Sequence, residues 1–386
     1  MQVSRIYYEN SLEKVERWVE ENRYMGYEPF DGLSSFLRPV TMNNILAERL
    51  LQQLVRQCPI NLRPVLGVKP QESTKGRGYM AWGYLKRFRA TSERQYLTKV
   101  QSCFDWLLQH KAPGYVKPSW GNHFDFTSRA GRLPKQEPII VWTSLIGQVF
   151  LDAYQLLHDK KYLETAVMIC DWILDLPRER TSSGSCISYV AFTQSSIHNS
   201  NMLGAAMLAR TAKYTGNKDM LRVSRDAMQY SCSRQLPDGS WYYGEGLKTR
   251  WIDNFHTGYN LDSLKCYIDS TGDTTYRENL ERGFRYYKSH FFENSGRPRY
   301  YHNRVYPVDI QCASQAIDTL AYFADQDKEA LLLAQRVANW TIDNMQDRKG
   351  YFYFRQLPGI KSRTPMLHWG QATMYKALAH LLEVMP

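Results

Sequence analysis

Residues 235–264, QLPDGSWYYGEGLKTRWIDNFHTGYNLDSL, contain a turn, an aromatic run, a charged loop and a helix start within thirty residues. The residues PDG at 237–239 predict the turn, because proline presets one backbone angle and glycine accepts a left-handed one. The run WYY at 241–243 predicts an extended arm. Asp253 then stands where a helix would begin, with apolar residues following at helical spacing. His256 therefore falls in the first turn of that helix.

The same plan recurs along the chain. Helical patterns pair at 79–90 with 93–110, 139–158 with 160–175, 199–215 with 217–234, 255–270 with 273–291 and 311–325 with 327–345, before a last helix at 367–384. An aromatic or β-prone run follows each second helix, at 113–121, 182–190, 237–245, 295–303 and 347–355. A period of roughly 55–60 residues with two helices per unit is a repeat signature.

The first 78 residues are less regular. The pattern predicts helices at 9–24 and 42–57, and in the second it turns six apolar residues inward: Ile45, Leu46, Leu50, Leu51, Leu54 and Val55. Residues 58–78, which include the basic KGRG at 75–78, are predicted to form a long surface connection. We expect residues 1–386 to form a single domain, with N-terminal helices and a connection in 1–78 and repeated helical hairpins in 79–386.

Closure of the repeat decides the fold class. An open solenoid needs polar caps at both ends, whereas a closed ring does not. Six inner helices beginning near 79, 139, 199, 255, 311 and 367, with five outer helices and the N-terminal region, bring the count to twelve. The sequence thus predicts an all-α (α/α)6 toroid, a barrel of helical hairpins with short β-hairpin arms at its mouth.

Several motifs also carry a family resemblance over most of residues 79–386. WGNHFDFTSR, EPIIVWTSLIG, DGSWYYGE, WIDNFHTGYNLDSL and HWGQA resemble a family of bacterial proteins found with polysaccharide biosynthesis. The helical domain of that family is similar to the C-terminal domain of glucuronyl C5-epimerase. The resemblance implies a carbohydrate substrate class more than a particular reaction.

Composition narrows the partners and the compartment. A net charge of +11 favours an anionic partner, here an acidic oligo- or polysaccharide. Peripheral membrane association stays open, no nucleic-acid module is recognisable, and the oligomeric state is unread. Without a signal-peptide pattern at the start, we expect a cytoplasmic protein. The seven cysteines form neither a CxxC pair nor a metal spacing, so they predict reduced core residues, no metal and no cofactor.

The mouth of a toroid is lined by residues just before and inside each inner helix. Catalytic candidates at these positions are His256, Tyr259, Tyr243, Asp253, His368 and Asp125. Substrate-binding candidates are Trp120, Arg129, His198, Asn199, Asn201, Glu245, Arg250, Tyr306, Asp309, Gln311 and Trp369. Four of the nine histidines, His123, His198, His256 and His368, occupy equivalent helix starts, and histidine is suited to proton transfer near neutral pH.

Three functions fit these residues. A uronyl epimerase or lyase neutralises the sugar carboxylate with Arg, Asn or Gln and abstracts the C5 proton with His or Tyr. A glycoside hydrolase needs a carboxylate pair, for which Asp125, Glu245, Asp253 and Asp309 are candidates, although Asp253 and Asp309 also suit helix N-caps. The third is a non-catalytic glycan-binding or assembly protein. The basic, tyrosine-rich composition favours the first.

Overall fold

Two concentric sets of helices form the body of the protein. The computed structural model describes residues 5–128 and 131–386. The inner helices are α3 (Thr74–Thr91), α5 (Ile140–Leu157), α7 (His198–Thr215), α9 (Asn254–Thr271), α11 (Ile310–Tyr322) and α13 (Thr373–Val384). The outer helices are α1 (Arg5–Glu21), α4 (Arg94–Gln109), α6 (Lys160–Asp175), α8 (Lys218–Cys232), α10 (Arg277–His290) and α12 (Lys328–Met345).

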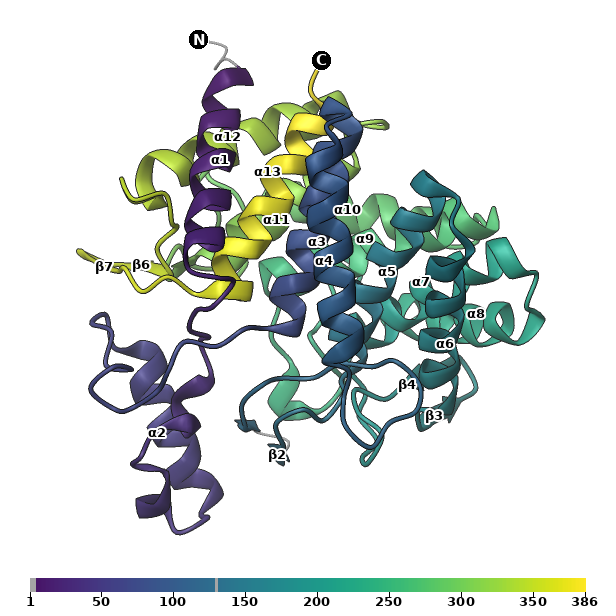
Figure 1. The fold of residues 1–386 in the computed structure, drawn as a ribbon. Coiled ribbons are helices and arrows are strands. Elements are labelled where there is room, and N and C mark those ends of the chain that lie inside the picture. Colours follow the sequence, from purple (N-terminus) through teal and green to yellow (C-terminus); the bar gives the residue numbers. More distant parts are fainter. Residues whose placement is uncertain (1–4, 129–130) are drawn as a thin grey trace.

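The inner helices close into a ring. Each packs on the next in chain order, and α13 packs on α3, so the last inner helix meets the first. Each inner helix also contacts an outer partner, and α1 at the start of the chain supplies the partner of α13 (Figure 1). The protein is therefore an all-α (α/α)6 toroid, and the predicted fold class is confirmed.

Burial separates the two sets of helices. On α4, Tyr96, Val100, Cys103, Phe104 and Leu107 are buried and the opposite face is exposed, as expected of an outer amphipathic helix. On α5, the residues from 140 to 153 are all buried. Within the described residues only α5 is long and apolar enough to cross a membrane by length and composition, and its burial identifies it as a core helix of the ring.

Recurrent glycines end two of the inner helices. Gly216 and Gly272 follow α7 and α9 with φ of 70° and 72°, and their amides bond back to Ala212 and Ile268. Such left-handed caps suit glycine, which has no Cβ to clash. Thr215-Gly216 and Thr271-Gly272 thus form the same kind of helix end in two consecutive units.

Short antiparallel strands lie where the inner helices begin. Strand β1 (Phe126–Ser128) pairs with β2 (Gly131–Leu133), and β3 (Arg178–Thr181) pairs with β4 (Gly184–Ile187). The third sheet has β6 (Arg355–Leu357) between β5 (Val308–Asp309) and β7 (Ile360–Ser362). The predicted arm at 241–243 is non-helical but forms no strand. The amide of Tyr243 donates to the carbonyl of Trp251 at 2.8 Å, whereas Trp241 is buried in the core and its Nε1 donates to the carbonyl of Ser231 at 2.9 Å.

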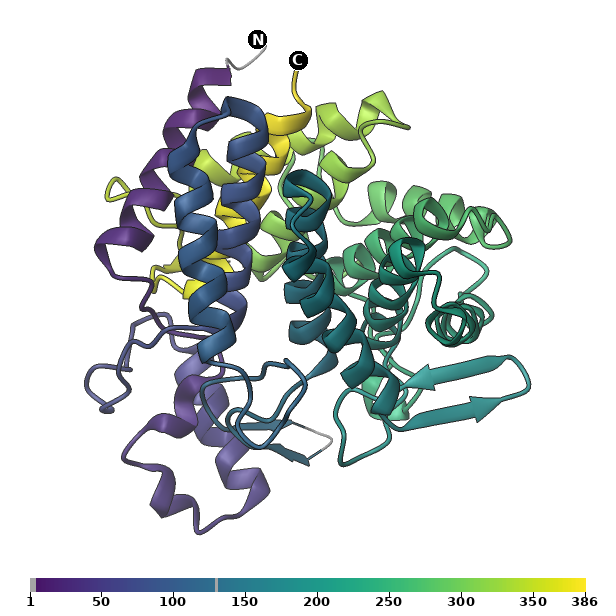
Figure 2. The ribbon, with the colours of Figure 1, turned by 45° about the vertical axis from the view of Figure 1, so that its right-hand side comes forward.

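Between α1 and α3 the chain leaves the ring. It forms the short 3-10 helices η1 (Asp31–Ser34) and η2 (Arg38–Thr41) and then α2 (Ile45–Gln57), which stands out below the ring in Figures 1 and 2. Of the six apolar residues predicted to point inward, Val55 is buried and Leu51 is half-buried, but the prediction is wrong for Ile45, Leu46, Leu50 and Leu54. Leu46, Leu50 and Leu54 are 66%, 66% and 67% exposed, whereas Glu48 and Gln52 are buried.

Contacts with β1 explain this reversal. Thr127 donates its hydroxyl to Glu48 Oε2 at 2.9 Å, and its amide donates to Gln52 Oε1 at 3.2 Å. The polar face of α2 therefore faces the ring. The predicted loop at 75–78 is also wrong, since α3 already begins at Thr74, where Ser73 caps it by accepting from the amide of Gly76.

Candidate functional site at the mouth of the ring

A histidine held by an aspartate stands at the start of α9. Asp253 is the N-cap of the helix and accepts from the amide of His256 at 3.0 Å. Its other oxygen, Oδ2, lies 2.7 Å from Nδ1 of His256 and also accepts from Nε1 of Trp251 at 2.8 Å. Because a carboxylate only accepts, the neutral imidazole carries its proton on Nδ1, and in that form Nε2 is the nitrogen that can act as a base. The His256 side chain is 19% exposed, so that nitrogen is within reach of a ligand.

The second histidine of the mouth is fully engaged. His198 is buried, and its Nε2 lies 2.8 Å from Oε1 of the half-buried Glu245. Its Nδ1 lies 3.1 Å from the hydroxyl of Ser231. The hydrogen bond from His198 lowers the pKa of Glu245. With both ring nitrogens bonded, His198 positions Glu245 rather than moving protons.

A row of rings leads away from His256 in two directions. Tyr243 lies 4.4 Å from His256 between ring centroids and stacks on Trp251 at 4.5 Å. On the other side, Phe255 lies 4.0 Å from His256 and 5.4 Å from Trp369. Trp369 in turn lies 5.8 Å from Phe30. Flat apolar faces with polar edges suit the stacking of sugar rings.

A surplus of positive charge lies at the far end of this row. The guanidinium of Arg56 lies 4.4 Å over the ring of Phe30. Burial, and then the charge of Arg355, lower the pKa of Arg56 to about 10. Arg355 pairs with Asp309, whereas Arg56 makes no ion pair within the described residues and its Nε lacks a hydrogen-bond partner. Two guanidinium groups and one carboxylate leave one uncompensated cation, which favours an anionic ligand.

Beneath the mouth lies a buried cluster of titratable groups. His368 Nδ1 lies 2.7 Å from Glu28 Oε2, yet neither atom has a hydrogen bond of good geometry. Burial raises the pKa of Glu28 to about 7 and lowers the pKa of Lys75 to about 7. Burial also lowers the pKa of His123 to about 4, and it holds the pKa of His368 well below its usual value. This cluster is poised to exchange protons near neutral pH.

Tyrosines close the axis of the ring below that cluster. Tyr79 on α3 and Tyr259 on α9, which stand opposite each other in the ring, hydrogen-bond through their hydroxyls at 3.0 Å. Gln311 donates to the same Tyr259 oxygen at 3.1 Å, and Lys75 Nζ lies 3.4 Å from it. We call Lys75, Tyr79, Tyr259 and Gln311 the septum, because they separate the mouth from the opposite end.

A cavity of about 470 Å³ lies beyond the septum, and side chains of all six inner helices line it. Two of the carboxylates that line it, Asp262 and Asp318, behave in opposite ways. Burial, and then the charge of Asp318, raise the pKa of Asp262 to about 8. Burial also opposes ionisation of Asp318, but the charge of Lys376 and a hydrogen bond with His380 hold its pKa below the usual range. One carboxyl is thus protonated and the other ionised at neutral pH.

The predicted site residues fall into three groups. Those gathered around the mouth or the septum are His256, Tyr259, Tyr243, Asp253, His368, His198, Glu245, Asp309, Gln311 and Trp369. Trp120, Asn199 and Asn201 are buried instead, and Asn201 bonds the amide of Ile187 and the carbonyl of Ala227. Asp125 pairs with Arg38, Arg250 is exposed beside Tyr242, and half-buried Tyr306 lies beneath Arg297. Arg129 lies outside the described residues.

Sequence reasoning missed three groups at this site. Arg56 was assigned to an ordinary helix, and Lys75 to a loop, although Ser73 and Thr74 are a recognisable helix start. The pair Asp262 and Asp318 lies inside inner helices. An inner helix is buried on most faces, so a carboxylate in its middle must be paired or must face a cavity. The presence of Asp262 and Asp318 in predicted inner helices could therefore have indicated this cavity.

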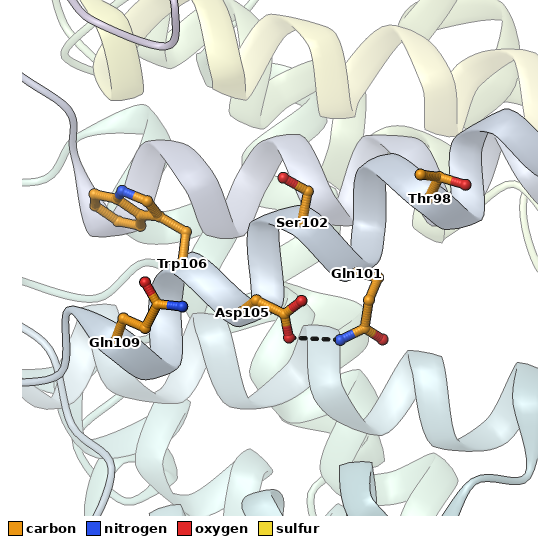
Figure 3. A pocket seen from close by; sticks show the side chains of 6 residues that line it. All are labelled: Thr98, Gln101, Ser102, Asp105, Trp106 and Gln109. Atoms are coloured by element: carbon orange, nitrogen blue, oxygen red, sulfur yellow. Dashed lines mark hydrogen bonds between the residues drawn. The ribbon is translucent and has the colours of Figure 1, made fainter.

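Neither a second hollow nor a metal-ligand cluster offers a competing site in the described part of the chain. One face of α4 borders a hollow of about 470 Å³, whose side chains all come from that single helix (Figure 3). Gln101 donates there to Asp105 at 2.7 Å, so part of its polar capacity is already used. No group of three or more His, Cys, Asp or Glu side chains suited to a metal occurs in residues 5–128 and 131–386.

Comparison with known proteins identifies neighbours of the fold. No family model matches the chain, and no curated protein matches it in sequence. Cellobiose 2-epimerase from Bacillus thermoamylovorans B4167 superposes with a TM-score of 0.62 at 10% identity, covering 81% of this chain and 87% of that one. A sugar epimerase from a ruminal bacterium gives 0.63 at 10% identity over 82% and 90%.

Glycoside hydrolases share the same architecture. The GH76A α-1,6-mannanase from Salegentibacter sp. HEL1_6 gives a TM-score of 0.60 at 11% identity, covering 82% of this chain and 90% of that one. An inactive variant of that mannanase was solved with α-1,6-mannotetrose. Epimerases and hydrolases of saccharides therefore occur together among the structural neighbours, and at these identities the likeness shows the fold.

Proposed function

We propose that this protein is a carbohydrate-active enzyme that moves a proton on a uronic-acid-containing saccharide, with His256 as the base. The hydrogen bond that Asp253 makes with His256 carries the proposal. It fixes the tautomer that leaves Nε2 unprotonated, in a partly exposed position beside aromatic rings. Saccharide epimerases among the structural neighbours support the same class.

The geometry supplies a role for each side chain. The saccharide stacks on the aromatic row, and Arg56 at the far end of the row binds the carboxylate of another uronic-acid unit, which holds the chain in place over His256. His256 Nε2 takes the C5 proton. Burial raises the pKa of Tyr243 well above its usual value, so its hydroxyl stays protonated beside His256 and can donate a hydrogen bond to the saccharide. In epimerisation a proton from solvent is added at the opposite face of C5. Elimination of the 4-substituent gives the lyase outcome instead.

Proton exchange tests the proposal. The protein is incubated with a panel of uronic-acid polysaccharides in deuterated water, and deuterium at C5 is read by NMR. We expect incorporation with the wild type, its loss in His256→Ala, and no change in His110→Ala, which removes an exposed histidine directly after the outer helix α4. A rise in absorbance near about 232 nm identifies elimination. The absence of both signals across the panel rejects the proposal.

A second candidate, glycoside hydrolysis, rests on the cavity beyond the septum. At the mouth, Asp125, Glu245, Asp253 and Asp309 each already have a basic or histidine partner. In the cavity, protonated Asp262 offers an acid, and Asp318, which Lys376 and His380 keep ionised, offers a base. Reducing ends that appear with the wild type and vanish in Asp262→Asn, while His256→Ala keeps full activity, favour this candidate over proton transfer at the mouth.

A further inference from the structure

A stripe of bare apolar side chains runs along α2. Leu46, Leu50 and Leu54 follow one another at intervals of four residues, so they lie along one side of the helix, and Met42 precedes them in the turn between η2 and α2. They are 87%, 66%, 66% and 67% exposed. We call these four residues the α2 apolar face. Exposed leucines are ordinary one at a time, but a continuous row marks a binding surface.

The loops on either side of α2 extend this character. Phe36, Val40, Ile60 and Val65 are also more than half exposed. Together with Ile45 and the α2 apolar face, they make nine of the eighteen large apolar side chains that are exposed in the described part of the chain. We call residues 34–71 the α2 lobe. Much of its apolar surface is not covered by the rest of the protein.

Charge indicates what covers this face. Between residues 34 and 71 the chain has one carboxylate, Glu48, which is buried and paired with Arg132 at 2.8 Å. Lys69 is exposed and Arg49 half-buried, so the charge that the lobe offers to solvent is positive. An apolar helix face flanked by basic side chains is the pattern of a helix lying in the interface of an anionic membrane.

A second copy of the chain fits this face less well. Related by a two-fold axis, two such lobes would set the basic side chains of one against those of the other. The lobe has no exposed carboxylate to compensate them. Anionic lipid headgroups supply the missing negative charge, and the acyl chains beneath them accept the leucines.

We propose that the α2 apolar face docks on an anionic lipid bilayer, with Arg49 and Lys69 at the level of the headgroups. This proposal does not rest on the proposed function. The opposite face of α2 is fixed to the ring through β1 and β2, and Gln57 accepts from Arg355 of the mouth at 3.3 Å. Docking through α2 therefore holds the mouth close to the membrane surface.

Vesicle binding tests this proposal. The full-length protein is sedimented with vesicles of phosphatidylcholine alone and with vesicles that also contain phosphatidylglycerol. We expect binding to the anionic vesicles, weakening with added salt because the Debye length shortens. Changing Leu46, Leu50 and Leu54 together to Gln lowers the affinity about tenfold or more, since each loses its transfer from water.

Matched variants separate this surface from general stickiness. Leu108→Gln, Met168→Gln and Leu332→Gln change apolar side chains of α4, α6 and α12 that are 39%, 42% and 56% exposed. This triple variant should bind like the wild type. Arg49→Glu with Lys69→Glu should lose the preference for phosphatidylglycerol, and circular dichroism checks that each variant is folded.

Three results overturn the proposal: no sedimentation with either vesicle, equal loss in the control triple variant, or unchanged binding in the α2 variants. Light scattering after size exclusion gives a fourth. A wild-type dimer that the α2 leucine variant converts to a monomer, without vesicle binding by either, assigns the face to a second copy.

Discussion

Asp253 caps the N-terminus of α9 and also accepts a hydrogen bond from His256, and one substitution separates these two roles. In Asp253→Asn the amide oxygen still caps the helix, because Asn is as good an N-cap as Asp. The amide nitrogen that replaces Oδ2 cannot accept the hydrogen bond from His256 Nδ1. The tautomer with a free Nε2 is therefore no longer favoured. We expect deuterium exchange at C5 to fall by roughly 10²–10⁴-fold with little change in the midpoint of thermal unfolding. Asp253→Ala should lose both, and equal activity in Asp253→Asn and the wild type would contradict the role given to this carboxylate.

The raised pKa of Asp262 predicts how the stability of the protein depends on pH. Its pKa is about 8 in the folded protein against a usual value of 3.8. Between these two values the folded chain keeps a proton that the unfolded chain has released, so this carboxyl reduces stability as the pH rises from about 4 to 8. Asp262→Asn mimics the protonated form and can still accept from Gln315.

Urea unfolding measured at several pH values checks this sign. The stability of Asp262→Asn relative to the wild type should rise with pH across that window. Asp175→Asn, a change in an exposed carboxylate, serves as the control and should show no such trend. A difference that shrinks as the pH rises would contradict the assignment of the raised pKa to Asp262.

At the scale of elements, the seam between α3 and α13 closes the ring, and Gly83 allows their close approach. A Cβ added at Gly83 would overlap the ring of Tyr375 and come within 3.4 Å of the Lys376 backbone. We expect Gly83→Ala to cost about 1–3 kcal/mol of unfolding free energy. Gly246→Ala is the matched control, because its φ is −65° and the nearest atom is 3.4 Å away. Chemical denaturation measures both, and equal stability of the two variants would show that the seam can absorb a methyl group.

The sequence predicted the helices better than what lies between them. The boundaries of α6 and of most inner helices agree closely with the periodic pattern. Apolar residues recur at every third or fourth position along a helix that buries one face, so this signal is present in the local sequence. The α2 leucines failed because periodicity identifies an apolar face without saying what it faces. The hydrogen bonds of Glu48 and Gln52 to β1 were formed with residues about 75 positions away, which no local pattern reports.

The position of the mouth was predicted correctly, but only some of the side chains that form the candidate site were predicted. The rule that site residues precede inner helices identified the dyad of Asp253 and His256. The same rule could not find Arg56, which reaches the mouth from α2, or the carboxylates of the cavity, which lie in the middle of their helices. These depend on how separate units face one another across the ring. The resemblance to glucuronyl C5-epimerase, the cytoplasmic location and the single-domain division stay predictions.

At the scale of the whole molecule, the cysteines report how open each part of the ring is. All seven are free; Cys58 and Cys266 are partly exposed and the other five are buried. Cys266 also lines the cavity beyond the septum. With iodoacetamide and peptide mapping, we expect these two to react first in the native protein, and all seven to react in urea. Protection of Cys266 in the native protein, at the level of the buried five, would mean that the cavity is closed to reagents.

The hydrogen bond between Tyr79 and Tyr259 has a consequence for how a long glycan would be handled. A ring of helices resembles a bead with a hole, and a polymer could in principle be threaded through it from one side to the other. The two tyrosines act as a crossbar in that hole. A chain that enters at the mouth must back out the same way, so each encounter serves one end or one exposed stretch of the polymer. An internal stretch of a polymer would therefore reach the mouth only by lying across it, and never by passing along the axis of the ring from the opposite end.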